Sequence, residues 1–228
     1  MSVTSAIPAL WEHIATTYHP AVIEAFSAVI FQFVFWWIPS TIYVSLDYIA
    51  PSFSARHKIQ PAPKQPTFKE IQQCLLVAVR NSLTTTAFQT SILYMMYRAD
   101  ASPAHKFDPE IPPSPTLCET LSSVHHQFTA PVAYASQYAH PVEHILANVL
   151  PIGLPSVVLH THILTSLVFA AWQLFQTSTV HSGYDFFAGM ARQHDRHHER
   201  FDVYFGHGII DWLHGTDEKD FKKTKKKD

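Results

Sequence analysis

Residues 21–46 read AVIEAFSAVIFQFVFWWIPSTIYVSL, and Glu24 is their only charged residue. As an α-helix this stretch would be about 39 Å long at 1.5 Å per residue, which exceeds the roughly 30 Å hydrocarbon core of a bilayer. Trp36, Trp37 and Tyr43 suit the aromatic belt at a membrane surface. A buried core helix is the alternative, but core helices rarely run so far without charge. The stretch therefore predicts a membrane-spanning segment.

The composition of the 228 residues also fits a membrane protein, because only 15% are charged against about a quarter in soluble domains. Sixteen basic and 18 acidic side chains give a net charge of −2, so no global basic field indicates a nucleic-acid partner. Two cysteines, Cys74 and Cys118, cannot build a disulfide framework or a thiolate metal site. They favour a reducing, cytosol-facing setting.

Later stretches are apolar but interrupted. Residues 71–97 form a weaker span because Arg80 and Asn81 lie inside it, and Pro151 and Pro155 break residues 145–176 into two short helices or a re-entrant hairpin. The expected fold is all-α, with polytopic membrane helices and a histidine-rich helical cap on the cytosolic side. Four regions follow from composition: a membrane-spanning region at 1–97, an irregular proline-rich segment at 98–123, a histidine-rich region with the hairpin at 124–217, and a lysine-rich tail at 218–228.

The orientation in the membrane is predicted from the basic segments. Residues 51–66 form a polar, proline-rich linker that cannot continue a helix, and both this linker and the tail favour the cytosol under the positive-inside rule. If residues 71–97 cross fully, the region after them would lie on the opposite face, so either that stretch is re-entrant or the linker is lumenal. Lys225 and Lys226 match the dilysine pattern of endoplasmic-reticulum retrieval, although any lysine-rich tail can match it by accident.

Histidine is the most informative residue type. Its 16 copies equal the Lys plus Arg count, and most lie in the carboxyl-terminal half. On a helix, His194, His197 and His198 would share one face, as would His140 and His144. Neutral imidazole binds Fe, Zn, Cu and Ni. A lone histidine is more often a hydrogen-bonded core residue, but this grouping beside membrane spans indicates a metal site.

The residue types also limit the choice of metal. Without thiolates a zinc-finger role is excluded, and a zinc hydrolase is disfavoured because no HExxH helix supplies a general base. Seven or more clustered histidines can hold two ions. Two redox-active irons beside lipid-facing helices would suit the oxidation of an unactivated carbon–hydrogen bond by dioxygen. Carboxylates that could orient the imidazole rings are available at Glu143, Asp185 and Asp195.

Several ordered motifs resemble the sterol desaturase and fatty acid hydroxylase superfamily. They are AxxYAHPxEHxxAN at 135–148, TVHSGYDF at 179–186, HDxHHExF at 194–201 and IIDWLHGTD at 209–217. Within it, VHHQFTAPVA at 124–133 and KIQPxPKQPT at 58–67 are most similar to the fungal methylsterol monooxygenase (C-4 methylsterol oxidase) branch. The likeness covers roughly residues 20–217, and the joint occurrence of the motifs is far more specific than any one of them.

The resemblance implies a monooxygenase of the endoplasmic-reticulum membrane with two non-haem irons in a cytosolic cap. Dioxygen and electrons from NAD(P)H, passed through a cytochrome b5-type redox partner, would oxidise a sterol, another lipid or a terpenoid in lipid or sterol biosynthesis. The substrate would enter from the bilayer near Trp36, Phe169 and Trp172. The implied metal ligands are His125, His126, His140, His181, His194, His197 and His198, with Glu143, Asp185 and Asp195 orienting them.

The sequence departs from this pattern where the first histidine box, HRxxH, should stand. Pro109 and Pro113 occupy the expected histidine positions, and Ser122 replaces the first histidine of the second box. Either the chain is a diverged, catalytically impaired paralogue that acts as a lipid-binding or scaffold protein, or an intron boundary placed wrongly has substituted residues 98–123. The abrupt return to family-like sequence at Val124 favours the altered exon.

Overall fold

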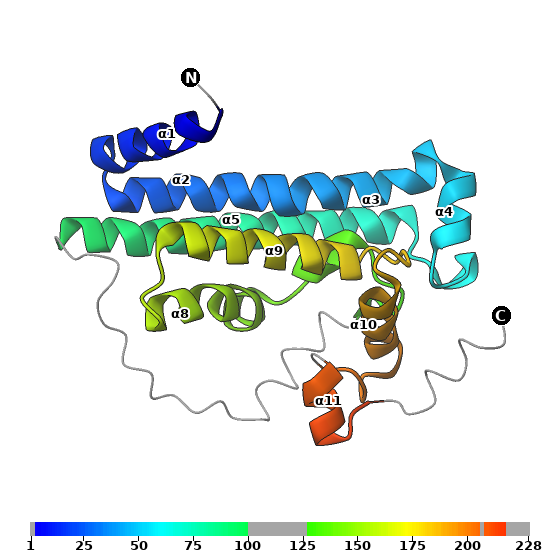
Figure 1. Ribbon diagram of the computed structural model, residues 1–228. Coiled ribbons are helices and arrows are strands. Elements are labelled where there is room, and N and C mark those ends of the chain that lie inside the picture. Colours follow the sequence, from blue (N-terminus) through cyan, green and yellow to red (C-terminus); the bar gives the residue numbers. More distant parts are fainter. Residues whose placement is uncertain (1–2, 100–126, 206–207, 218–228) are drawn as a thin grey trace.

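The computed structural model describes residues 3–99, 127–205 and 208–217, which form helices joined by short turns (Figure 1). No strand occurs among these residues; Lys58 and Tyr184 form an isolated β-bridge. The all-α prediction is therefore confirmed. The helical elements are α1 (Val3–Thr17), α2 (Pro20–Gln32), η1 (Phe33–Trp37), α3 (Ile38–Ile49), α4 (Pro51–His57), η2 (Ala62–Lys64), α5 (Phe68–Arg98), η4 (Ala133–Gln137), α7 (Pro141–Glu143), η5 (His144–Val149), α8 (Leu150–Val158), α9 (Ile163–Val180), α10 (Ala188–Arg200) and α11 (Gly208–His214).

The first predicted span is one continuous helix made of α2, η1 and α3. It begins at Pro20, whose missing N–H is harmless in the first turn, and it ends at Ala50, where the backbone leaves the helical region. By length and apolar composition three helical segments of the described chain can cross a membrane, namely Pro20–Ile49, Pro141–Val158 and Ile163–Val180. The polytopic membrane fold is thus confirmed.

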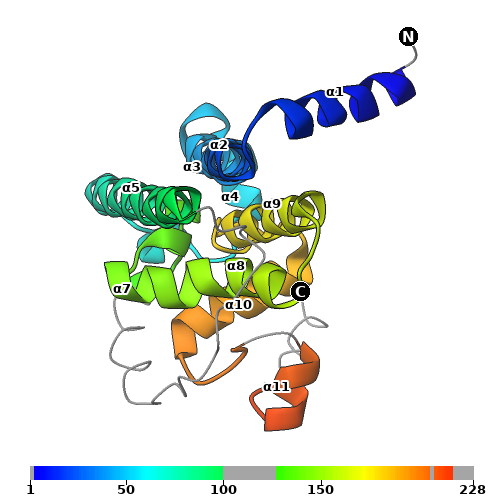
Figure 2. The same cartoon turned by 90° about the vertical axis from the view of Figure 1, so that its left-hand side faces the viewer.

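Helix α5 lies beside α2 and α3 and runs in the opposite direction (Figures 1 and 2). A reciprocal capping box starts it, because the Thr67 hydroxyl accepts from the Glu70 N–H while the Glu70 carboxylate accepts from the Thr67 N–H. Its 31 residues are long enough to cross a bilayer, at roughly 46 Å, but Arg80 and its polar neighbours keep it out of the apolar class. This agrees with the weaker span expected at 71–97.

Two π-helical turns accommodate prolines inside the long helices. Turn η1 ends two residues before Pro39, and turn η5 ends two residues before Pro151. A proline leaves the carbonyl four residues earlier without its usual partner, and a π turn shifts the hydrogen bonds so that the helix continues. Consequently the hairpin expected at 145–176 does not break at Pro151 or Pro155; α8 passes through both, and the turn falls at residues 159–162.

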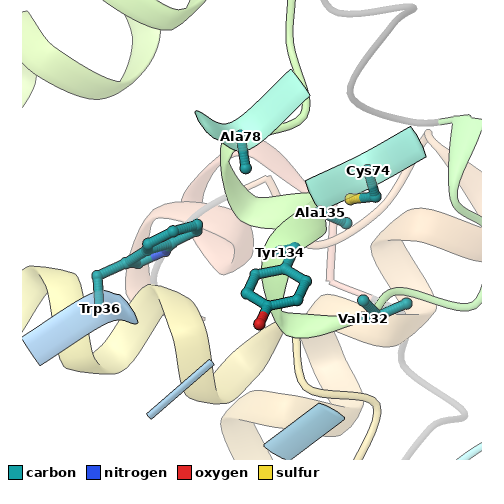
Figure 3. Close-up of a cluster of buried hydrophobic side chains, with 6 residues drawn as sticks. All are labelled: Trp36, Cys74, Ala78, Val132, Tyr134 and Ala135. Carbon is teal, nitrogen blue, oxygen red and sulfur yellow. The ribbon is translucent and has the colours of Figure 1, made fainter. Parts of the chain in front are cut away.

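The core surrounds Trp36 and the buried segment η4 (Figure 3). Trp36 is completely buried, and its indole N–H donates to Ser136 Oγ at 2.8 Å. The Asn81 amide donates to the carbonyl oxygens of Gln137 and Ala139 at 2.8 and 2.9 Å. These contacts satisfy polar groups of a short 3-10 segment and the residues after it, which the surrounding helices bury. The packed cluster consists of Trp36, Cys74, Ala78, Val132, Tyr134 and Ala135.

The cap lies at the end of the bundle where α3 and α9 finish and α5 begins (Figure 1). Helix α10 crosses this end, and α11 lies to the side of the bundle, away from α2 and α5 (Figures 1 and 2). The linker predicted at 51–66 starts as the short helix α4, because a proline in the first turn begins a new helix readily. Residues 57–66, called the arm below, then run across the cap.

Candidate metal centre

Three imidazole rings converge where α9 ends and α10 crosses the bundle. His194 Nε2 lies 2.8 Å from His181 Nε2 and 3.1 Å from His198 Nε2. Two nitrogens bonded to one ion at about 2.1 Å lie about 3.0 Å apart at a right angle and about 3.4 Å apart at a tetrahedral angle. Within the ranges that the structure describes, His181, His194 and His198 form the group of histidine, cysteine or acidic residues whose ligand atoms lie close enough together to hold an ion. The donor set therefore fits a metal that prefers imidazole.

Backbone carbonyl groups fix the tautomer of two rings. The His181 Nδ1–H can donate to the Thr177 carbonyl oxygen at 2.8 Å, and the His197 Nδ1–H to the Val203 carbonyl oxygen at 2.8 Å. In each ring this leaves a lone pair on Nε2, the atom that would bind a cation. His181 and His198 are almost fully buried, so water has little access to the converging nitrogens.

Helix α10 presents His194 and His198 on one face because they are one turn apart. Both ends of the helix are set by left-handed residues, Phe187 at φ 54° and Phe201 at φ 62°. The Phe201 N–H donates to the His197 carbonyl at 2.8 Å, as in a left-handed helix cap. Gly183, just after His181, has a φ of +74°, and a Cβ there would lie 2.8 Å from the Pro131 carbonyl oxygen. Only glycine fits this turn.

The arm attaches α4 and α5, which flank it, to the histidine cluster. The Ile59 N–H donates to the Gly183 carbonyl and the Asp185 N–H to the His57 carbonyl, both at 2.9 Å. At its far end, Lys64 Nζ pairs with Glu199 Oε1 at 2.8 Å. The arm therefore contacts both segments that supply the converging rings.

The buried contact of the arm joins Gln60 to Asp195. Gln60 Nε2 lies 3.1 Å from both Asp195 carboxylate oxygens and donates to the Thr129 carbonyl at 2.7 Å. Both side chains are buried. Burial raises the pKa of Asp195 to about 6, although the Gln60 hydrogen bond opposes the rise. Asp195 directly follows His194, so this bond also fixes the start of the ligand-bearing turn.

A second buried network anchors the arm to the end of α3. Lys58 Nζ lies 3.1 Å from Asp47 Oδ2 and 4.2 Å from the centre of the Tyr184 ring. The Tyr184 hydroxyl lies 3.1 Å from Asp47 Oδ1 and 3.0 Å from Ser54 Oγ, which also bonds Asp47. Burial lowers the pKa of Lys58, and the Asp47 carboxylate opposes this effect. The network thus satisfies charges that burial would otherwise penalise.

The other residues expected from the sequence lie in different surroundings. The His197 ring is 6.0 Å from the centres of the His194 and His198 rings, beside the three converging nitrogens. His140 caps α7, where its Nδ1 accepts from the Val142 N–H at 3.3 Å. Two expected ligands, His125 and His126, fall outside the described residues, as do residues 100–123 of the segment expected to be irregular.

The carboxylates expected to orient the rings contact other partners. Asp185 Oδ1 lies 3.0 Å from His57 Nδ1, and Asp185 Oδ2 lies 3.7 Å from Arg192. Glu143 is buried and accepts from the His140 N–H at 3.3 Å. Both groups therefore stabilise local turns of the cap and of α7, and Asp195 accepts from Gln60.

The arm residues were not expected at the site. Gln60 carries no charge and lies among prolines, so the sequence around it resembles an ordinary linker. The feature that could have indicated its role was the family-like motif KIQPxPKQPT. Two small cavities, of about 10 and 20 Å³, lie beneath the arm beside Lys58 and Gln65, and each has room for about one water. Of the side chains expected near the substrate, Trp36 lies in the core, whereas Phe169 and Trp172 are exposed on α9.

Comparison with protein families identifies the family to which the chain belongs. Residues 82–216, more than half of the chain, match the family model described as fatty acid hydroxylase. The chain belongs to the fatty acid hydroxylase family. The matched range contains all three converging histidines of the centre, whereas the arm precedes it. Membership in the fatty acid hydroxylase family confirms the resemblance drawn from the motifs.

The chain is also similar to curated proteins with several different names. Fatty acid hydroxylase domain-containing protein 2 of Macaca fascicularis is 25% identical over 247 residues, covering 95% of this chain and 74% of that protein. Methylsterol monooxygenase erg25B of Aspergillus fumigatus is 34% identical over 98 residues (37% of this chain, 33% of that protein), and very-long-chain aldehyde decarbonylase GL1-8 of Oryza sativa subsp. indica is 32% identical over 123 residues (48% and 45%). The latter two matches span less than half of the length of those two proteins.

No solved structure matches the chain significantly. The alignment with the macaque member of the fatty acid hydroxylase family also reveals a difference in length. It extends over 247 residues, whereas 95% of this 228-residue chain is about 217 residues. The aligned part of this chain is therefore about 30 residues shorter.

Proposed function

We propose that the protein is a membrane-bound non-haem diiron oxygenase that oxidises a carbon–hydrogen bond of a sterol or another lipid. Membership in the fatty acid hydroxylase family supports an oxidoreductase that modifies lipids. The single observation that carries the proposal is the convergence of three imidazole Nε2 atoms, from His181, His194 and His198, on one point. Nitrogens this close need either a shared proton or a common cation.

Iron, when bound, would supply the activation of dioxygen that no side chain can provide. His181, His194 and His198 would hold one ion. His197, directed by Val203, would contribute to a second together with His125 and His126. His140 remains a proposed ligand of this second group.

The residues of the chain prepare the site in three ways. The carbonyls of Thr177 and Val203 hold the protons of His181 and His197 on Nδ1, so each Nε2 is ready to bind a cation. The hydrogen bonds of Gln60 to Asp195 hold the first turn of the ligand face against the arm. Burial of His181 and His198 excludes bulk water from the reacting centre.

The names of the relatives support the proposed substrate class, and the resemblance of the motifs supports the proposed electron source. Two of the relatives, a methylsterol monooxygenase and a very-long-chain aldehyde decarbonylase, are named for lipid compounds. We propose a sterol, fatty acyl or terpenoid substrate that enters from the bilayer, with NAD(P)H-derived electrons delivered by a cytochrome b5-type partner. We place the protein in the endoplasmic-reticulum membrane with its carboxyl terminus in the cytosol.

Metal analysis of the full chain, purified in detergent after expression with iron, tests the proposal. We expect about two irons per chain in the wild type and about one fewer in His194→Ala, whose ring touches both other rings. His57→Ala is the matched control, because His57 lies at the same end of the bundle but pairs with Asp185. About one zinc and no iron would indicate a hydrolytic centre, and equal iron in both variants would contradict the assignment of His194.

The alternative is a catalytically impaired protein that binds lipid or a partner as a scaffold. Two observations favour it: the missing histidines at positions 109, 113 and 122, and the aligned region shorter by about 30 residues than in the macaque relative. A protein of this kind would bind no iron even with all three converging rings intact. Transcript sequence across residues 97–124 separates the explanations, since an HRxxH box there would restore the enzyme.

A further inference from the structure

Helix α11 carries an apolar face that no described part of the chain covers. Ile209, Trp212 and Leu213 are 81%, 70% and 72% exposed. Their spacing of three and four residues places them on one side of the helix. Three large apolar side chains exposed together on one helix face indicate a surface that meets an apolar partner.

The opposite side of α11 is fixed, so this exposure belongs to a defined orientation. Asp211 is buried, and its carboxylate accepts from the Thr216 hydroxyl at 2.8 Å. The Thr216 N–H donates to the Asp211 carbonyl at 2.9 Å, and its own carbonyl accepts from the Tyr204 N–H at 3.1 Å. These bonds close a loop from residue 204 to residue 216 that holds α11 with its apolar face outward.

The position of α11 suits a membrane surface. It lies to the side of the bundle and level with the last turns of α9 (Figure 1). Helix α9 is one of the three apolar segments that are able to cross a bilayer. From the other view it is again the outermost helix of the cap (Figure 2). A side chain at this level and distance from the bundle lies where lipid headgroups surround the spans. Tryptophan is enriched at that depth.

The sequence after α11 adds charge of the matching sign. Residues 222–227 read KKTKKK, which places five lysines within six residues soon after the helix ends at His214. Basic clusters next to an apolar surface are attracted to anionic lipids of the cytoplasmic leaflet. We propose that α11 and this lysine run form a membrane-surface anchor, with Ile209, Trp212 and Leu213 inserted among the lipids of an anionic leaflet. The anchor would hold the cap, and the histidine centre inside it, against the bilayer.

The experiment uses the full chain, reconstituted as single copies in lipid nanodiscs, with bimane attached to Leu213→Cys. Asp202→Cys, an exposed position of the same cap, is the matched control, and Cys118→Ser removes the competing thiol. We expect nitroxide-labelled lipids to quench bimane several-fold more at position 213 than at position 202. Adding phosphatidylserine to phosphatidylcholine should increase quenching at position 213, and replacing the five lysines with glutamine should abolish that increase.

Other outcomes overturn the proposal. Equal quenching at the two positions would show that α11 stays in water. Shielding of position 213 from aqueous iodide without quenching by lipid would show that protein, either another part of this chain or a partner, covers the face. Both cysteine positions are exposed, so neither label should disturb folding. A melting temperature of each labelled variant equal to that of the unlabelled protein would verify this.

Discussion

Replacing Gln60 with leucine should remove the buried bond between the arm and the ligand helix. The amide donates to the Thr129 carbonyl and to both oxygens of Asp195. Leucine occupies a similar volume but donates nothing, so the buried Asp195 carboxylate and the Thr129 carbonyl would both lose a partner. The substitution therefore tests whether the arm holds the cap by this contact.

The expected magnitude follows from the two kinds of bond. A hydrogen bond to a charged group contributes about 1.5–3 kcal/mol and one between neutral groups about 0.5–1.5 kcal/mol. Gln60→Leu should therefore lower the free energy of unfolding by about 2–4 kcal/mol. For a chain of this size each kcal/mol corresponds to roughly 2–4 °C of melting temperature. The melting temperature should fall by roughly 5–15 °C.

Thermal unfolding of the detergent-purified, iron-free chain, followed by helical circular dichroism, measures this change. Lys64→Gln is the matched control because Lys64 also joins the arm to α10, through an exposed ion pair with Glu199. Such pairs contribute at most about 1 kcal/mol. Gln60→Leu should consequently lower the melting temperature several times more than Lys64→Gln does.

A double-mutant cycle with Asp195→Leu isolates the contact. If Gln60 and Asp195 interact as described, the second substitution should cost less in the presence of the first, with a coupling of at least about 1 kcal/mol. Additive effects, or a loss in Gln60→Leu no larger than in Lys64→Gln, would refute the reasoning.

Three further substitutions test other contacts by the same melting assay. Tyr184→Phe removes a buried hydroxyl bonded to Asp47 and should cost about 1.5–3 kcal/mol; a change below half of that would contradict the network. Asn81→Leu removes the donor to the carbonyls of Gln137 and Ala139 and the acceptor of an Arg80 hydrogen bond and should cost about 2–4 kcal/mol, whereas a neutral result would show that these bonds do not stabilise the fold. Thr67→Ala removes the cap of α5 and should cost about 1 kcal/mol, with Thr67→Ser restoring most of it.

The membrane part of the fold could be predicted because its signal is local. The charge-poor run at 21–46 lies entirely within the helix Pro20–Ile49. The hydrocarbon core of a bilayer excludes charge whatever the neighbouring helices do. The position of the later turn was harder to predict, since the rule that proline breaks helices ignores the π turn that lets α8 pass Pro151.

The centre could be predicted in part. The spacing of His194 and His198 fixes their common face through helical geometry alone, and their Nε2 atoms do lie 3.1 Å apart. The contact of His181 with His194 depends instead on how α9 and α10 cross, which only tertiary packing determines. Gln60 could not be found by residue chemistry, because an uncharged amide among prolines resembles any linker.

The arm has a consequence for biosynthesis. Its partners Gln60 and Asp195 are 135 residues apart in sequence, so nascent arm and ligand helix emerge from the ribosome at very different times. Both must also reach the same side of the bilayer, because no contact can form across it. Insertion errors in any intervening helix would thus separate them and leave the Asp195 carboxylate without its Gln60 donor.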